Sequence, residues 1–249
     1  MSTQLPTQFK ILLIGDNCLD VYQYGTIDRL SPEAPVPVFV PTYTEEREGM
    51  AGNVFKNLEA LGCDVNYLFG ETSTKTRLID SRSKQQIVRI DDDVISAPIV
   101  FETDIPQVYD AVIVSDYDKG TVSYELIEEL IALSIPIFID TKKTDLERFQ
   151  GAWVKINELE YSKIKSECTG LIVTRGSKGA RVIHHDIECP APNVEVSDVT
   201  GAGDTFLAAL AFEYLKTKDI AQAVKFAVKA SAVTVQHLGV YAPGLKDIE

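Results

Sequence analysis

Apolar residues along the chain form short continuous runs that alternate with longer segments of helical spacing. The runs have the length of buried strands and cover residues 9–15, 65–69, 111–115, 135–140, 153–156 and 170–174. Apolar residues recur every three or four positions in the segments 51–61, 122–133, 158–166, 204–215 and 220–236, which predicts helices there. Strands and helices that alternate in this way form a mostly parallel sheet flanked by helices on both faces. We therefore predict a doubly wound α/β fold.

Two stretches depart from this alternation and predict a small β flap or lid. The prolines between Pro35 and Pro41 disfavour a helix and favour an extended chain. Residues 76–80 and 86–91 alternate between apolar and polar positions on either side of 81–84, as the strands of a hairpin do. No repeat, low-complexity tract or long linker divides the chain. We predict a single domain over residues 1–249, with lid strands near 20–45 and 75–92.

The composition is that of an ordinary soluble protein, and it restricts the partners. The chain has 249 residues, of which 45% are hydrophobic and 24% charged, so it can bury one substantial core. No apolar run approaches the roughly 20 residues that cross a bilayer, and the polar N-terminus lacks the features of a signal peptide. The net charge of −13 disfavours binding to the phosphates of nucleic acids. We expect a cytoplasmic protein that binds neither membranes nor nucleic acids.

Cysteine and histidine are not spaced as metal ligands usually are. The four cysteines, Cys18, Cys63, Cys168 and Cys189, lie far apart without a C-x-x-C pair, and the three histidines form no H-E-x-x-H motif. We interpret the cysteines as buried free thiols in a reducing compartment. A zinc site, a disulfide framework and a histidine-based metal enzyme are therefore not favoured.

The segment 194–206 carries the strongest chemical signal, because a strand-like run there leads through a turn of small residues into a helix. Gly201 and Gly203 allow the backbone to approach a phosphate group and to point amides at it. Asp204 follows at the helix start, where it could accept a proton from a substrate hydroxyl that attacks a γ-phosphorus. The same residues also fit an ordinary helix start, with Asp204 complementing the helix dipole. The sequence contains neither G-x-x-x-x-G-K-[ST] nor G-x-G-x-x-G, so phosphates would bind by another device.

Several motifs resemble one known family. The turn from Thr200 to Asp204 resembles the signature of the ribokinase-like (phosphofructokinase-B type) carbohydrate kinases. Further segments resemble the heptose-phosphate kinase branch of that family: Gly15–Asp20, Arg29–Val38, Ser81–Asp91, Ser115–Gly120 and Asp145–Ala152. The resemblance implies a ribokinase-like fold and ATP-dependent, Mg²⁺-assisted phosphoryl transfer to a sugar or sugar phosphate. The specific reaction that it implies converts D-glycero-D-manno-heptose 7-phosphate to the 1,7-bisphosphate. The alternatives are a kinase of another sugar, such as a pentose or hexose phosphate, and an inactive homologue that binds a sugar or a nucleotide.

The resemblance also implies roles on the acceptor side of the site. Asp204 corresponds to the catalytic base, and Gly201, Ala202 and Gly203 to the anion hole. The implied sugar ligands are Asp16, Asp20, Gly49 and Asn53. Met50 stands where the family has a second glycine, and a methionine there should reshape the sugar pocket if that glycine needs a positive φ. Arg77, Lys84, Arg89 and Lys119 are candidates for a substrate phosphate, and we favour Arg89 and Lys119, although most such residues are surface charges.

On the nucleotide side, Asn157 and Glu160 match the family's Asn-x-x-Glu element, which implies that Glu160 binds Mg²⁺ through water. The segment containing Thr174, Gly176 and Gly179 resembles the part of the family that lines the nucleotide site, and it also fits a simple hairpin turn. Asp198 stands where the family often has a ligand for a monovalent cation such as K⁺.

The chain is shorter than the members of the family that it resembles. Segments are missing between Gly70 and Thr76 and between Glu160 and Gly170. A missing helix exposes apolar surface that a second subunit could cover, and lid strands offer edges for pairing. We therefore predict a homodimer that forms through the lid or through the exposed periphery of the sheet.

Overall fold

The computed structural model describes residues 8–101 and 108–248. The described strands form one sheet in the order β10-β9-β8-β7-β6-β5-β1-β3-β4, with β2 paired to the outer part of β1. The strands are β1 (Lys10–Leu30), β2 (Pro37–Met50), β3 (Asp64–Asp80), β4 (Gln86–Asp92), β5 (Ala111–Asp116), β6 (Ile137–Thr141), β7 (Trp153–Asn157), β8 (Leu171–Thr174), β9 (Ala180–Val182) and β10 (Ile187–Cys189). The helices are α1 (Ala51–Ala60), α2 (Tyr124–Ile131), α3 (Glu158–Tyr161), α4 (Ala202–Thr217), α5 (Ile220–Thr234) and α6 (Leu245–Ile248).

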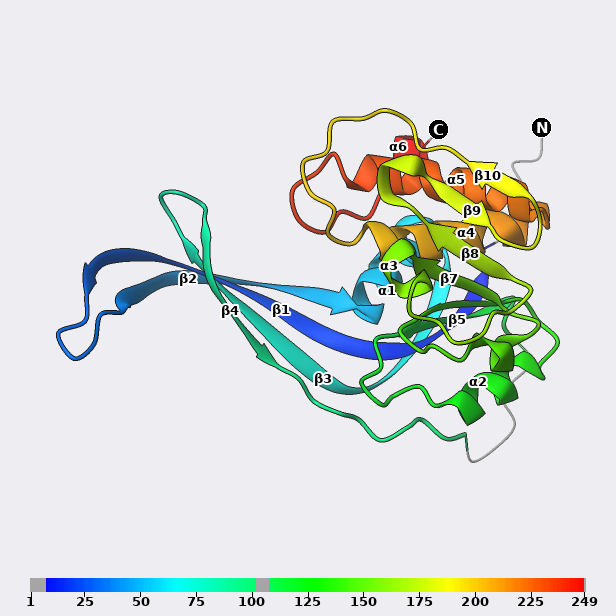
Figure 1. The fold of residues 1–249 in the computed structure, drawn as a ribbon, viewed down its shortest axis with the longest axis horizontal. Coiled ribbons are helices and arrows are strands. Elements are labelled where there is room, and N and C mark those ends of the chain that lie inside the picture. Colours follow the sequence, from blue (N-terminus) through cyan, green and yellow to red (C-terminus); the bar gives the residue numbers. More distant parts are fainter. Residues whose placement is uncertain (1–7, 102–107, 249) are drawn as a thin grey trace.

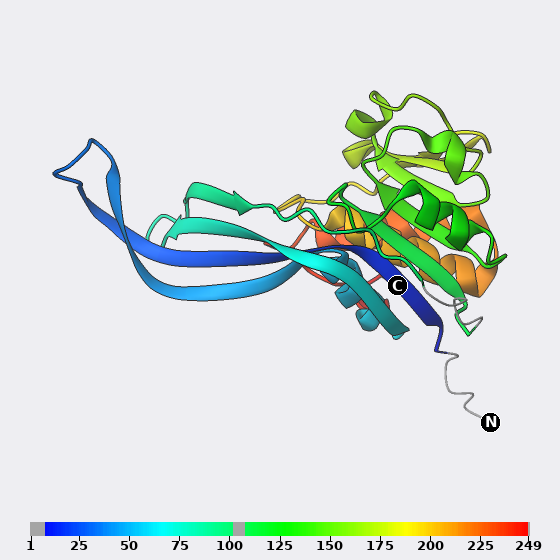
Figure 2. The same cartoon turned by 90° about the horizontal axis from the view of Figure 1, so that it is seen from below.

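The central strands are parallel and buried on both faces, as predicted. In β1, Ile11 and Leu13 pack into the core that contains α1, α4 and α5, whereas Leu12 and Ile14 pack into the core that contains α2. Successive side chains of a strand point to opposite faces, so an uninterrupted apolar run supplies both cores. Figure 2 shows these helices on the two sides of the sheet. The predicted α/β fold is confirmed. None of the described helices has the length and apolar character needed to span a membrane.

The lid is a four-stranded extension of the same sheet, with the order β2-β1-β3-β4. It is the long arm that projects from the body in Figure 1. The predicted hairpin of residues 76–80 and 86–91 lies in β3 and β4 and turns near 81–85. The strand predicted over 9–15 was too short, because β1 continues to Leu30. Its outer half lies in the lid and lacks the continuous apolar run of a strand buried on both faces, which explains why the pattern stopped early.

The helix predicted over 158–166 was also wrong in extent, since α3 ends at Tyr161. The amide of Lys163 donates to Glu160 O at 2.9 Å, and the amide of Lys165 turns away to Thr144 O at 2.7 Å. The chain therefore leaves the helix after one turn and crosses directly toward β8.

An extended segment, residues 93–101, covers the α2 face near the place where sequence analysis finds the chain shortened. Its Ser96 amide donates to Lys119 O at 2.8 Å, and its Ser96 hydroxyl accepts from the Glu71 amide at 2.7 Å. A Cβ on Gly70 would lie 2.5 Å from Ser96 Oγ, and one on Gly120 would overlap Ser96 O. Both glycines are required for this close approach. The segment thereby joins the base of the lid to the loop that follows β5.

Candidate active site

Asp204 lies at the first turn of α4, buried to 7% exposure, beneath the base of the lid. Its Oδ2 accepts a hydrogen bond from Asn53 Nδ2 at 2.8 Å, and its Oδ1 accepts one from the Tyr117 hydroxyl at 3.0 Å. The three residues come from α4, from the first turn of α1 and from the loop after β5. The structure therefore brings together two predicted site residues, Asn53 and Asp204, that are 151 positions apart.

Burial raises the pKa of the Asp204 carboxyl from its ordinary 3.8 to about 6. The hydrogen bond from Asn53 opposes this shift, the negative charge of Asp140 adds to it, and Lys155 and Tyr117 oppose it. A carboxyl with a pKa near 6 is ionised at neutral pH yet basic enough to accept a proton in a transition state. This environment suits a general base better than a simple complement to the helix dipole.

Two glycines before Asp204 leave space for functional side chains. Gly201 has φ 79°, and a Cβ there would lie 2.6 Å from Asn53 Nδ2. A Cβ on Gly203 would lie 2.8 Å from Lys155 Nζ. The absence of side chains at these positions lets Asn53 reach Asp204 and lets the Lys155 ammonium approach the N-terminus of α4.

Lys155 and Asp140 form a buried ion pair beside the turn of residues 200–204, which we call the catalytic turn because of its predicted role. They extend from β7 and β6, their Nζ and Oδ2 atoms are 2.6 Å apart, and their side chains are 6% and 7% exposed. The other carboxylate oxygen, Asp140 Oδ1, has no hydrogen-bond partner among the described residues. A buried charge pair with an unsatisfied oxygen at the edge of a parallel sheet is typical of a place where ligands bind.

The amides of the predicted anion hole differ from one another. Those of Gly201 and Gly203 have no acceptor within the described part of the chain, whereas the Ala202 amide donates to Val199 O at 3.3 Å. Ala202 is therefore not a free donor in this structure, because the turn that precedes α4 closes onto its amide. The free donors of Gly201 and Gly203 lie where the dipole of α4 favours negative charge.

Asp16 is 1% exposed, and its carboxylate is hydrogen-bonded to backbone amides. Its carboxylate accepts hydrogen bonds from the amides of Tyr117, Lys119 and Thr121, at 2.7, 3.1 and 3.3 Å respectively. These bonds fix the loop after β5: Oδ2 accepts two amides and Oδ1 one, so Oδ1 keeps a site for a further donor.

Asp20 lies on the lid face that adjoins the catalytic turn. Its Oδ1 pairs with Arg77 Nη1 at 2.5 Å, and a Cβ on Gly49 would overlap its Oδ2. Gly49 therefore makes room for the predicted sugar ligand. The next residue, Met50, is 6% exposed and adopts φ 51° and ψ −129°, a conformation that glycine tolerates and other residues rarely adopt. The expectation that the family glycine has a positive φ at this position fits this geometry.

The two favoured candidates for a substrate phosphate are both paired with acidic neighbours. Arg89 donates from Nε to Asp91 Oδ1 at 2.7 Å, and half of its side chain is exposed. Lys119 pairs with Asp93 Oδ2 at 2.6 Å. Because the pairs lie at the outer lid strand and at the segment 93–101, neither residue contacts the catalytic turn.

Asn157 and Glu160 form a reciprocal capping box at the start of α3. The Asn157 side chain accepts from the Glu160 amide at 2.9 Å, and Glu160 Oε2 accepts from the Asn157 amide at 2.8 Å. The other carboxylate oxygen of Glu160 pairs with Lys142. These bonds hold the carboxylate at the carboxyl end of β7.

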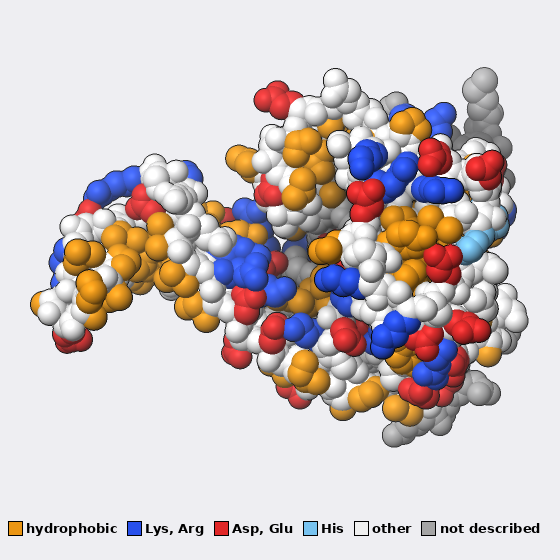
Figure 3. Space-filling view, viewed as in Figure 1, with side chains coloured by type: hydrophobic (Ala, Val, Ile, Leu, Met, Phe, Trp, Pro, Cys, Tyr) orange, Lys and Arg blue, Asp and Glu red, His pale blue; other side chains and the backbone are white. Residues whose placement is uncertain are grey.

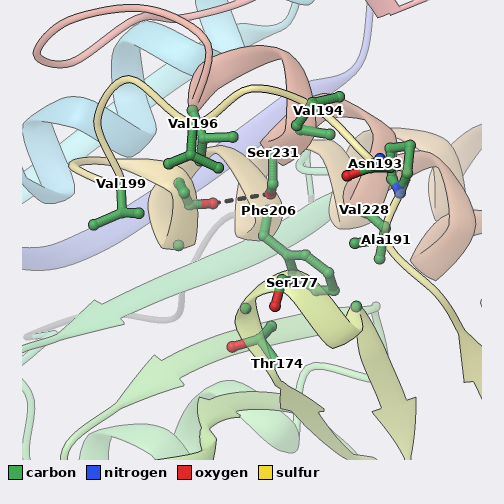
Figure 4. A pocket seen from close by; sticks show the side chains of 17 residues that line it. Thr174, Ser177, Ala191, Asn193, Val194, Val196, Val199, Phe206, Val228 and Ser231 are labelled. Atoms are coloured by element: carbon green, nitrogen blue, oxygen red, sulfur yellow. Dashed lines mark hydrogen bonds between the residues drawn. The ribbon is translucent and has the colours of Figure 1, made fainter.

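A cavity of about 330 Å³ opens on the other side of the catalytic turn (Figure 4). Thr174, Gly176 and Gly179 line it, and the same residues also form the turn between β8 and β9. The apolar walls come from Val194, Val196, Val199, Phe206, Val228 and Val235. Ala202 and Gly203 border the cavity, so the catalytic turn separates it from Asp204. Its apolar walls and few polar groups suit a flat aromatic base.

Asp198 organises the approach to the catalytic turn. Its Oδ1 accepts from the Thr200 amide at 2.9 Å and from the Thr200 hydroxyl at 2.7 Å, while its Oδ2 accepts from the Gly239 amide at 2.9 Å. Burial alone would raise the pKa of the carboxyl, but these hydrogen bonds hold it below the ordinary value. Among residues 8–101 and 108–248, no group of three or more His, Cys, Asp and Glu side chains is placed to hold a metal ion.

Sequence analysis did not identify Tyr117, Asp140 or Lys155, three of the residues nearest to Asp204. Tyr117 lies just beyond β5 and Asp140 next to the last residue of β6, at the strand ends where ligands bind in open α/β sheets, whereas Lys155 lies in the middle of β7. A search for polar residues at the ends of predicted strands would have selected Asp140 and Tyr117. A lysine inside the apolar strand 153–156 was a further signal.

Known proteins resemble this chain in sequence and in fold. Residues 147–247 match a family model described as "pfkB family carbohydrate kinase". The bifunctional protein HldE of Nitratiruptor sp. is 35% identical over 300 aligned positions, which cover 96% of this chain and 64% of that protein. HldE of Campylobacter curvus is 33% identical with the same coverage. The chain thus spans less than two thirds of the length of these relatives.

Solved structures support the fold. Ribokinase of Arabidopsis thaliana, in complex with ribose and ATP, superposes with a TM-score of 0.72 at 16% identity and covers 97% of this chain and 98% of its own. Phosphofructokinase-2 of Escherichia coli, in complex with potassium, superposes with a TM-score of 0.70 at 15% identity, with 97% of both chains covered. The ribokinase-like architecture predicted from the sequence is confirmed. Residues 147–247 thus match the pfkB family of carbohydrate kinases, and the HldE relatives and the ribokinase-like fold agree with that match.

Proposed function

We propose that the chain transfers the γ-phosphoryl group of ATP to a hydroxyl group of a sugar phosphate. The observation that carries this proposal is Asp204, a buried carboxylate of raised pKa that lies beside the unpaired amides of Gly201 and Gly203. Asp204 takes the hydroxyl proton as the new oxygen–phosphorus bond forms and the bond to the ADP oxygen breaks. The amides and Lys155 stabilise the negative charge on the transferred group.

ATP fits the cavity beyond the catalytic turn. Its apolar walls would enclose the adenine, and Gly176 and Gly179 would allow the backbone to lie close to the nucleotide. The phosphates would then extend over Ala202 and Gly203 toward Lys155, whose ammonium adjoins Gly203. Ribokinase of Arabidopsis thaliana, which shares the fold, was solved with ATP and ribose. We place the reaction in the cytoplasm, where ATP is supplied.

Mg²⁺ fits the acidic groups at the same edge of the sheet. Glu160, through water, and the unpaired Oδ1 of Asp140 are hard oxygen ligands of the kind that Mg²⁺ prefers. When bound, the ion would neutralise charge on the β- and γ-phosphates. K⁺ is a second proposed ion, with Asp198 as its ligand. The potassium complex of the phosphofructokinase-2 that shares this fold supports its inclusion.

The acceptor that we propose is D-glycero-D-manno-heptose 7-phosphate, which would become the 1,7-bisphosphate. The sequence similarity to HldE proteins and the heptose-branch motifs support this choice. Figure 3 shows Lys and Arg side chains gathered where the lid joins the body.

Register places two arginines on the lid face that adjoins the site. Asp20 lies opposite Arg47 on β2, and Tyr22 lies beside Arg77 on β3, so their side chains share one face. The guanidinium groups of Arg47 and Arg77 lie 5.0 and 5.1 Å from the centre of the Tyr22 ring. A Cβ on Gly239 would overlap Arg47 Nη1, which brings this arginine against the loop that Asp198 holds. We therefore propose Arg47 and Arg77, which pair with Glu45 and Asp20, for the substrate phosphate in place of Arg89 and Lys119.

A kinase of another sugar is the second candidate. Met50 supports it, because a buried side chain at the start of α1 occupies space that a glycine would leave open beside Gly49 and Asn53. A pentose or a hexose phosphate would then be the acceptor. The reaction and the proposed roles of Asp204, Gly201 and Gly203 would be the same.

We also propose a homodimer that forms through the lid. Both edge strands of the lid, β2 and β4, have an unpaired side within the described structure. Exposed apolar side chains occur along the lid, including Val36, Val40, Val88 and Ile90. A second copy would cover both features. Sedimentation should give twice the chain mass of 27.5 kDa, and a monomer at micromolar concentration would contradict this proposal.

The test of the function is ATP turnover with a panel of acceptors: heptose 7-phosphate, the unphosphorylated heptose, ribose and fructose 6-phosphate. Phosphorus NMR of the product identifies the phosphorylated position. We expect Arg77→Met to raise KM for heptose 7-phosphate about tenfold more than for the unphosphorylated heptose. Arg82→Met is the matched control, since Arg82 is a lid arginine that is 68% exposed and paired with Asp28. Absence of transfer to every acceptor, with ligand binding intact, would favour an inactive binding protein.

A further inference from the structure

The loop after β5, residues 116–121, connects two sequence motifs that sequence analysis treated separately. Asp16, in the first glycine turn, accepts three amide hydrogen bonds from this loop. The loop in turn places the Tyr117 hydroxyl 3.0 Å from Asp204 Oδ1. A buried carboxylate at the end of the sheet thereby fixes the backbone that carries a tyrosine to the proposed base.

Tyr117 is suited to act as a permanent donor. Burial, with the negative charge of Asp204 next, raises the pKa of its hydroxyl well above 10, so the hydroxyl keeps its proton at every pH at which the protein would be assayed. The side chain has little freedom to move, because the Lys142 ammonium lies 5.2 Å from the centre of its ring and the loop amides are held by Asp16.

Asp204 receives one hydrogen bond on each carboxylate oxygen, from Tyr117 on Oδ1 and from Asn53 on Oδ2. Each carboxylate oxygen has two lone pairs, so both oxygens keep a site for a substrate hydroxyl. The charged groups that also act on Asp204 are Asp140 on β6, Lys155 on β7 and Lys142 after β6. Of the contacting donors, only Tyr117 belongs to a loop and not to a helix or a strand.

We propose that Tyr117 is the positioning residue of the base: its hydroxyl fixes the orientation of the Asp204 carboxylate and stabilises the charged form, while Asp16 holds Tyr117 in place. The proposal rests on the kinase function proposed above. It assigns Asp16 an indirect role, in place of the direct sugar contact expected from the sequence.

The test is Tyr117→Phe, which removes the hydroxyl and keeps the ring. Loss of a donor to the carboxylate should raise the pKa of Asp204 by about one unit. The acid limb of the pH profile of kcat should move to higher pH by the same amount. The plateau of kcat should fall about tenfold, with KM for ATP unchanged. Tyr161→Phe is the matched control, because it removes a hydroxyl that donates to the exposed Glu167 at 2.9 Å.

Carbon-13 NMR titration of the Asp204 carboxyl provides a readout that does not depend on activity, with the Asp204→Asn spectrum for assignment. An unchanged titration in Tyr117→Phe overturns the proposal whether or not the wild type is a kinase. A wild type that transfers no phosphate, but whose Asp204 titration moves in Tyr117→Phe, refutes the kinase function and retains the contact.

Asp16→Asn distinguishes the two roles of Asp16. If Asp16 acts through Tyr117, this variant moves the acid limb in the same direction as Tyr117→Phe, and the double variant moves it no further. A higher KM for the sugar with the wild-type acid limb would instead identify Asp16 as a direct sugar ligand and overturn its proposed role.

Discussion

The ion pair of Asp140 and Lys155 gives the sharpest prediction about stability. Both side chains are less than a tenth exposed, and Asp140 Oδ2 has Lys155 as its partner while Oδ1 has none among the described residues. Lys155→Met keeps much of the side-chain volume but leaves a buried carboxylate without its cation. Breaking a buried pair in this way typically costs about 3–5 kcal/mol. That is a large fraction of the roughly 5–15 kcal/mol that stabilises a domain.

Urea denaturation at pH 7.5 measures the effect, and a double-mutant cycle with Asp140→Asn isolates the pair. We expect each single variant to lose several kcal/mol and the double variant to lose about 2 kcal/mol less than the sum of the two. Lys56→Met is the control, because Lys56 forms an exposed pair with Glu48 at 3.7 Å and should change the free energy of unfolding by less than about 1 kcal/mol. Strictly additive losses, or a loss below 1 kcal/mol for Lys155→Met, would refute the reasoning.

Three further predictions concern the catalytic turn. Because burial raises the pKa of Asp204 to about 6, kcat should fall roughly tenfold per pH unit below pH 6 and level off above it, and a flat pH–rate profile from 5 to 8 would count against Asp204 as the base. The same shift affects stability, because between pH 3.8 and about 6 the folded state keeps a proton on Asp204 that the unfolded state has released. The free energy of unfolding of the wild type should therefore fall as the pH rises through this window. Relative to the wild type, the urea midpoint of Asp204→Asn should rise from pH 4 to pH 7. Gly203→Ala should lower kcat/KM about a hundredfold, since its Cβ would lie 2.8 Å from Lys155 Nζ. Ala211→Gly on the same helix is its control for changes in the backbone of α4, and equal activity of Gly203→Ala and wild type would argue against a role for Lys155 near the phosphates.

The fold was predictable because its signals are local. Continuous apolar runs such as 111–115 and 135–140 correspond to strands buried on both faces, and the alternation in 76–80 and 86–91 corresponds to the lid hairpin. The extent of β1 was not predictable in this way. Its outer half is stabilised by pairing with β2, the next strand along the chain, and with the more distant β3, and not by a continuous apolar pattern of its own.

The catalytic turn was predictable for the same reason, since Gly201, Gly203 and Asp204 are adjacent. Its partners were not. Tyr117 and Lys155 reach the turn only because β5, β6 and β7 are neighbours in register, which a single sequence does not state. Asp16 is a further example: the family resemblance implies that it binds the sugar, but the sequence does not reveal that amides of a loop about 100 residues away also bind it.

An extended segment lies beside the shortened connection after Gly70. The segment 93–101 lies on the face of the sheet near the shortened connection after Gly70, and its Ile99 and Phe101 pack against the α2 core. Lys119 pairs with Asp93 in that segment, which connects the segment to the loop that carries Tyr117.

The most direct test of the proposed function compares wild type and Asp204→Asn in ATP turnover with heptose 7-phosphate, alongside ATP binding by calorimetry. Asparagine keeps the size of the side chain and removes its ability to accept a proton. We predict that kcat falls about 10³-fold while the Kd for ATP changes less than threefold. Turnover of Asp204→Asn within tenfold of the wild type would contradict the assignment of Asp204 as the base.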